Sequence, residues 1–121
     1  MILEDFQRRV AQRLGVLPVS GTLAAEDAAV IQGAYEGLVL ELGEHSLAWW
    51  NADEAVPDTF ADVLIGMVAA ALVDDFTIPE PRRSQLIAQC AFGLPAVSIN
   101  ERRLRALAAA APVDMPEVEY F

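Results

Sequence analysis

Apolar side chains recur every three or four residues along most of this chain, which is the spacing of one face of an α-helix. The first such stretch covers residues 2–14 and ends at Gly15, in the position where a glycine commonly terminates a helix. It predicts a short amphipathic helix. Its apolar positions lie on one face: Leu3, Phe6, Val10 and Leu14.

A second helix is expected from Thr22 or Leu23 to Leu42, with Gly43 ending it. Thr22 is a suitable N-cap residue. The acidic residues of the first turns, Glu26 and Asp27, suit the positive end of the helix dipole. The apolar stripe of this helix is made by Ile31, Tyr35, Leu38 and Leu42.

The most apolar segment predicts a third helix over residues 57–75. Its broad apolar face holds Phe60, Val63, Leu64, Met67, Val68, Ala71 and Leu72. The small residues Gly66, Ala69 and Ala70 allow other helices to approach closely. The uncharged run 63–73 is too short for a bilayer, which requires about 20 residues. We therefore expect a buried helix and no membrane partner.

Two shorter helices are expected after Pro79. One covers about residues 81–92, with Leu86, Ile87, Cys90 and Ala91 facing inward, and Gly93 and Pro95 end it. The other begins near Ser98 or Asn100 and runs to about Ala111, with Leu104 and Leu107 in the core. The sequence thus predicts an all-α bundle of four to five helices, formed by residues 1–111 as a single domain.

The connector between the second and third helices, residues 43–57, is long for a compact bundle. It carries both tryptophans, Trp49 and Trp50, followed by Asn51. In an extended segment adjacent side chains point to opposite faces. We therefore expect one tryptophan to fill the core and the other to contact a neighbouring subunit or partner.

The last ten residues, PVDMPEVEYF, form an apolar and aromatic chain end. Pro112 and Pro116 favour an extended tail, which reduces the entropy lost when it docks. Two alternatives stay open: the aromatic pair folds back onto its own bundle, or the tail binds another chain. In the second case the anchoring residues are Val113, Met115, Val118, Tyr120 and Phe121.

The formal net charge of −10 argues against a protein that wraps nucleic acid, which needs a basic footprint. All eight basic residues are arginines, in three clusters: Arg8, Arg9 and Arg13; Arg82 and Arg83; Arg102, Arg103 and Arg105. They are either solvated helix faces with internal ion pairs or docking sites for an acidic partner or a sister subunit. Arg82 and Arg83 are also placed to neutralise Asp74 and Asp75, which oppose the dipole of the third helix.

No catalytic or metal-binding pattern stands out. His45 is the only histidine and Cys90 the only cysteine, and neither has the neighbours of a nucleophilic site. The paired carboxylates Glu26–Asp27, Asp53–Glu54 and Asp74–Asp75 lack the spacing of metal ligands, and there is no glycine-rich phosphate loop. We expect no enzyme and no cofactor. The N-terminal segment also lacks the pattern of a signal peptide.

The order of these features resembles a known family. A helix ending in RLGVL is followed by AAEDAAVIQGAYEGLVLEL, the tryptophan connector WWNADEAVPD, the helix end AALVDDFTIP, the arginine-rich ERRLRALAA and a tail ending in EYF. Together they resemble the head-to-tail adaptor, or head completion, proteins of tailed bacteriophages and gene transfer agents, in particular the group related to packaged-DNA stabilisation proteins. The chain departs from relatives with an unbroken last helix, because Gly93 and Pro95 interrupt it, and this leaves the orientation of residues 81–111 open.

The resemblance implies a structural virion protein at the head–tail junction, made and assembled in the cytoplasm of a bacterial host. Such adaptors form a ring, typically of twelve identical subunits, beneath the portal protein. The ring extends the DNA channel, lets DNA pass without specific binding, and offers a platform to a tail or stopper protein. Residues 112–121 would dock on the portal, and residues 43–57 would face a neighbour, the lumen or the tail. An acidic channel wall would keep the passing DNA from sticking.

Two other functions remain open from the sequence. One is a small acidic helical binding or regulatory module, unrelated to virions, whose surface masks a basic partner. The other is an enzyme that uses His45 or Cys90.

Overall fold

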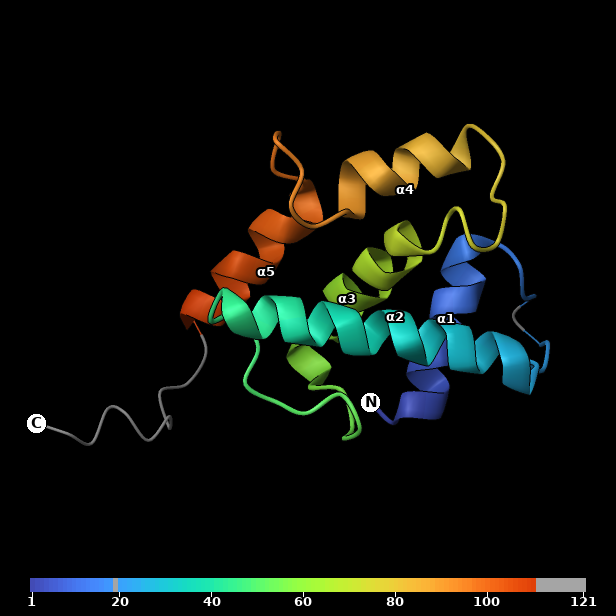
Figure 1. Ribbon diagram of the computed structural model, residues 1–121, viewed down its shortest axis with the longest axis horizontal. Helices are drawn as coiled ribbons and strands as arrows, with labels where there is room; N and C mark the ends of the chain where they lie inside the picture. The colour runs from blue at the N-terminus through green and yellow to red at the C-terminus, as the bar shows by residue number, and fades with distance from the viewer. Residues whose placement is uncertain (19, 111–121) are drawn as a thin grey trace, which may run out of the picture.

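The computed structural model describes residues 1–18 and 20–110, and within them the chain forms five α-helices and no β-strand (Figure 1). The predicted all-α class is therefore confirmed. The helices are α1 (Leu3–Leu14), α2 (Ala25–Glu44), α3 (Asp58–Ala71), α4 (Arg82–Cys90) and α5 (Ile99–Ala110).

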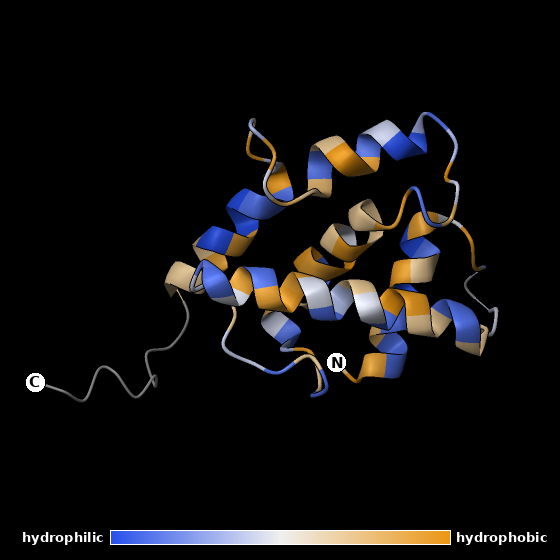
Figure 2. Cartoon of the chain, viewed as in Figure 1, coloured by the Kyte–Doolittle hydropathy of each residue, from blue (hydrophilic) through white to orange (hydrophobic). Residues whose placement is uncertain are grey.

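Helix α3 is the centre of the bundle, because each of the other four helices packs against it. Its residues 63–70 are all buried, and Figure 2 shows apolar colours along most of its length. The prediction of a buried third helix is confirmed, although Ala71 is exposed rather than on the apolar face. None of the described helices is long and apolar enough to cross a membrane.

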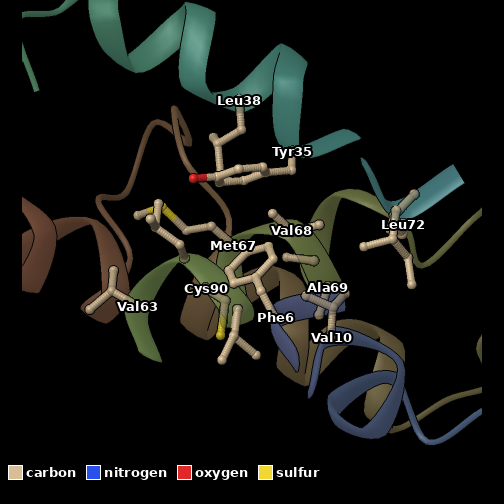
Figure 3. Packing of buried hydrophobic residues seen from close by; sticks show 14 of the residues in the cluster. Phe6, Val10, Tyr35, Leu38, Val63, Met67, Val68, Ala69, Leu72 and Cys90 are labelled. Carbon is tan, nitrogen blue, oxygen red and sulfur yellow. The ribbon is translucent and has the colours of Figure 1, made fainter. Parts of the chain in front are cut away.

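Helices α1 and α2 close one side of the core. The ring of Phe6 on α1 lies 4.7 Å from that of Tyr35 on α2, measured between centroids, and both side chains are fully buried. Figure 3 shows Tyr35 above Met67 and Val68 of α3, and Phe6 reaching the same core from below. The predicted stripes of α1 and α2 thus do form the core, with Leu3 only partly buried.

Helices α4 and α5 pack against each other and against α3. Leu86, Cys90 and Leu104 are their buried contributions, while Ile87, Ala91 and Leu107 are partly buried. The break at Gly93 and Pro95 therefore produces two helices rather than one long one. Gly93 has a φ of 86°, in the left-handed region that favours glycine.

The structure corrects several predicted helix ends. Gly15 does end α1, with a φ of 84°. Thr22 is not a cap: the N-cap of α2 is Ala24, without a side-chain hydrogen bond. Gly43 does not stop α2, which continues to Glu44 because its backbone still makes helical hydrogen bonds, the N–H of His45 donating to Glu41.

Helix α3 ends at Ala71, four residues before the predicted end, and turns follow it. In these turns the N–H of Thr77 donates to the Asp74 carbonyl, and that of Ile78 to the Val73 carbonyl. Thr77 has a φ of 52°, which no helix continues through. The chain reverses here and leads to α4.

Side chains satisfy the backbone at the starts of α4 and α5. Glu80 accepts hydrogen bonds from the N–H and the hydroxyl of Ser84, at 2.8 and 2.6 Å. These bonds hold the pKa of the Glu80 carboxyl below its usual value. At α5, the Ser98 hydroxyl accepts the N–H of Glu101 at 3.0 Å, which is a side-chain N-cap.

Side chains of three other helices come close to α3 at Gly66. A Cβ atom there would overlap Asn100 Nδ2 of α5 and lie 3.0 Å from Cys90 Sγ of α4. We expect Gly66→Ala to lower the free energy of unfolding by about 1–2 kcal/mol, since overpacking outweighs the gain in helix propensity. Chemical denaturation measures this.

The matched control is Gly33→Ala on the exposed side of α2, where a Cβ atom would have no neighbour within 4 Å. This variant should gain up to about 1 kcal/mol from helix propensity. Equal effects of the two substitutions would contradict the close approach at Gly66.

The low pKa of Glu80 predicts a pH-dependent contribution to stability. The bonds from Ser84 favour the ionised carboxyl, so they stabilise the fold above the unfolded pKa, near 4.5, and are lost as the pH falls through the lower folded value. Glu80→Gln should lower Tm at pH 7, and the difference from the original chain should shrink toward pH 3. The exposed Asp75→Asn serves as the control. A difference that stays constant with pH would contradict the prediction.

Candidate protein-interaction surface

The connector between α2 and α3 gathers aromatic rings at the start of α3. Trp50 is partly buried, and its indole N–H donates to the Tyr35 hydroxyl at 2.8 Å. Burial raises the pKa of Tyr35, and this hydrogen bond partly opposes the change. Trp49 stands edge-on to both Trp50 and Phe60, with centroid distances of 5.2 Å.

The expected division of roles between the tryptophans is confirmed in part. Trp50 packs on the core, while Trp49 is 54% exposed. The expectation that the two rings point to opposite faces is wrong, because the connector forms no strand here and the rings contact each other. Trp49 is therefore held in place by two aromatic contacts while much of its surface faces out.

An open groove of about 500 Å³ lies beside Trp49, between the C-terminal half of α2 and the connector. Leu40, which is 73% exposed, forms part of its apolar lining, and Glu36 and Glu44 contribute carboxylates. Asn51 also lines the groove, and its backbone N–H donates to Glu54 at 3.1 Å. We call this feature the acidic groove.

Leu40 was not predicted from the sequence as part of an interaction surface. It comes nine residues after Ile31, which places it half a turn away from the buried stripe of α2. A large apolar residue on the polar side of an amphipathic helix is the signal that marks such a position.

The arginines proposed for an interface do not form one cluster. Arg82 donates to the carbonyl of Arg13 at 3.0 Å, at the end of α1, and Arg83 forms an ion pair with Asp74, as the sequence suggested for the turn after α3. On α5, Arg105 pairs with the buried Glu101 at 3.1 Å, and its guanidinium lies 5.7 Å from the centroid of the Phe92 ring.

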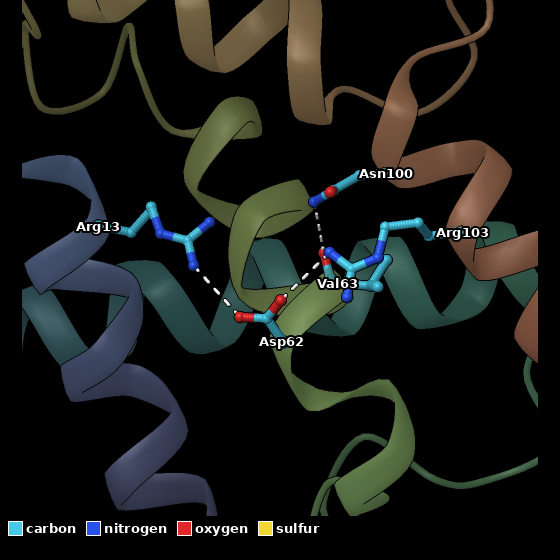
Figure 4. Close-up of polar contacts among 5 residues, drawn as sticks. All are labelled: Arg13, Asp62, Val63, Asn100 and Arg103. Carbon is cyan, nitrogen blue, oxygen red and sulfur yellow. Dashed lines mark hydrogen bonds and ion pairs between the residues drawn. The ribbon is translucent and has the colours of Figure 1, made fainter.

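Asp62 of α3 links two further helices through arginines. Its carboxylate accepts from Arg13 of α1 at 3.4 Å and from Arg103 of α5 at 3.2 Å (Figure 4). Beside it, the side-chain amide of Asn100 donates to the Val63 carbonyl at 3.1 Å. These exposed ion pairs contribute little energy each, but they fix the positions of the guanidinium groups.

Arg102 differs from the other four arginines proposed for an interface. It is exposed, and its guanidinium has no hydrogen bond or ion pair with any residue in ranges 1–18 and 20–110. It lies one turn after Ile99, which is 56% exposed, and Val97 just before α5 is 44% exposed. We call Val97, Ile99 and Arg102 the α5 patch. An interface role for the other four arginines stays a prediction.

Neither His45 nor Cys90 belongs to a recognisable catalytic arrangement among the described residues. His45 is exposed at the end of α2, with its ring 5.3 Å from that of Phe92. Cys90 is buried, which raises the pKa of its thiol against the opposing effect of Arg13. The described ranges contain no group of three or more His, Cys, Asp or Glu residues able to hold a metal ion. That the chain is not an enzyme stays a prediction.

The proposed docking residues Val113, Met115, Val118, Tyr120 and Phe121 lie outside the described residues. No family model, curated protein or solved structure matches the chain.

The different exposure of the tryptophans predicts a different response to a collisional quencher. Trp50→Phe leaves Trp49, whose fluorescence acrylamide should quench strongly, while Trp49→Phe leaves Trp50, which should be protected. Stern–Volmer plots of the two variants measure this. The same slope for both would contradict the arrangement of the connector.

Proposed function

We propose that this chain is a head-to-tail adaptor of a phage-like particle, a non-enzymatic subunit of a ring that sits beneath the portal protein. In this role the ring extends the DNA channel and provides the platform for a tail or stopper protein. The proposal combines the order of sequence features with the surfaces described above. The alternative, an acidic binding module unrelated to virions, lacks an explanation for the complete order of those features.

The observation that carries the proposal is the exposed Trp49 beside the acidic groove. An indole that is 54% exposed, yet held by contacts with Trp50 and Phe60, is pre-organised for protein contact. Tryptophan is enriched at the energetically dominant positions of protein interfaces. The connector that bears Trp49 is the segment expected to face a neighbour, the lumen or the tail.

The acidity of the chain fits a channel through which DNA must move. Carboxylates repel phosphate groups within a Debye length, about 8 Å at physiological salt. Five of the eight arginines form ion pairs with carboxylates of the described residues: Arg8, Arg13, Arg83, Arg103 and Arg105. These paired guanidinium groups are less available to hold a passing nucleic acid.

The tail provides the test of portal binding. We expect removal of residues 112–121 to abolish the binding of this chain to purified portal rings of the same particle, because five apolar or aromatic anchors are lost together. Co-sedimentation with portal rings measures it. Unchanged Tm and circular dichroism of the truncated chain serve as the folding control.

A double substitution tests the contribution of the two C-terminal aromatic residues to portal binding. Tyr120→Ala with Phe121→Ala should lower portal affinity by at least about tenfold, and Glu117→Gln with Glu119→Gln is its matched control. Normal binding of the truncated chain would overturn the assignment of the tail, and the absence of binding by the complete chain would overturn the adaptor.

A further inference from the structure

We propose that the acidic groove of one copy receives the α5 patch of a second copy. The groove brings Leu40 and Trp49 together with the carboxylates of Glu36 and Glu44. The α5 patch consists of Val97, Ile99 and Arg102. This inference rests on the proposed ring and names the two surfaces through which its subunits would meet.

The apolar parts of the two surfaces match. Seven large hydrophobic side chains are exposed in the described part of the chain, and four of them lie in these two places: Leu40, Trp49, Val97 and Ile99. Each surface places two large apolar side chains beside charged ones. An interface core of this composition, with a charged rim, is typical of specific protein association.

The charges match as well, and each is poorly placed within its own helix. Glu44 occupies the last turn of α2, where negative charge opposes the dipole, and that turn has no basic residue. Arg102 is the fourth residue of α5, near the positive end of that helix. Neither side chain has a hydrogen bond or ion pair with another described residue.

Contact between the two surfaces would offset the unfavourable charge near one end of each helix. Arg102 would bring a cation to the C-terminal end of α2, and Glu44 would bring an anion to the N-terminal end of α5. Arginine suits such a contact because its guanidinium binds a carboxylate with two parallel hydrogen bonds and also packs on an indole face.

The chain's own C-terminal segment is a poorer occupant of the groove. That segment contributes Asp114, Glu117 and Glu119, which would meet the carboxylates of Glu36 and Glu44. Like charges brought together at an interface oppose binding. The groove therefore favours a basic partner, and the α5 patch is an exposed surface of the described ranges that joins two large apolar side chains to an unpaired arginine.

The two surfaces are different, so the contact is head-to-tail rather than two-fold symmetric. Each copy that has filled its groove still presents its α5 patch to a further copy. A contact of this kind builds a closed ring when the rotation per subunit divides the circle, and an open filament when it does not.

Cross-linking of the complete chain tests the contact. Gly43→Cys places a thiol in the lining of the groove, and Ala106→Cys places one on exposed α5, one turn after Arg102. A short bis-maleimide should link a mixture of the two variants as heterodimers, and a chain with both cysteines as a ladder of trimers and larger species. The unaltered chain, whose buried Cys90 is its only thiol, is the control.

Charge reversal tests the pairing of Glu44 with Arg102. Glu44→Arg on the Gly43→Cys chain should lower the heterodimer yield by about fivefold, and Arg102→Glu on the Ala106→Cys chain should restore it. Asp75→Arg and Arg9→Glu make the same charge changes on other elements and should have no effect.

Three outcomes would overturn the inference. The first is no cross-linking above the control at millimolar protein, and the second is homodimers of one cysteine variant in place of heterodimers. The third is a heterodimer yield that does not change on charge reversal. They are separable from failure of the adaptor. A chain that fails here but binds portal rings through its tail remains an adaptor with a different subunit contact.

Discussion

The close approach of three helices to α3 at Gly66 is the constraint on which the rest of the structure depends. Asn100 of α5, Cys90 of α4 and Arg13 of α1 all come within 3.2 Å of the place where a Cβ atom would be. A Cβ atom here would displace the ends of these side chains, so the glycine lets side chains of all three helices meet α3 at one place. The packing of α1, α4 and α5 around the central helix is built on this meeting point.

The existence and faces of the helices could be predicted because their apolar residues repeat at the helical period. The stripe through Ile31, Tyr35 and Leu42 is buried as expected. The ends were less predictable, since a local cap candidate such as Thr22 competes with backbone bonds and packing that the sequence does not display. The early end of α3 likewise follows from backbone hydrogen bonds in the turns after Ala71, which the apolar pattern does not display.

The candidate surface was predictable only in part. Two adjacent tryptophans in a long connector marked it, but the outward position of Leu40 and the mutual contact of the indole rings depend on the tertiary arrangement. The arginine clusters show the same limit. Arg82 and Arg83 are neighbours in sequence, yet one binds a carbonyl of α1 and the other a carboxylate after α3.

The way the helices share α3 has a consequence for the native-state fluctuations of the molecule. Helices α1 and α2 contact each other and α3, and helices α4 and α5 also contact each other and α3. Helix α3 is therefore shared by two pairs of helices. The pair α4 and α5 is joined to the rest by the core around Cys90 and Leu104 and by the buried hydrogen bond from Asn100 to the Val63 carbonyl. Exposed polar contacts of Arg82, Arg83 and Arg103 add to it. Because both pairs pack against α3, its amide hydrogens are expected to exchange with solvent more slowly than those of the surrounding helices.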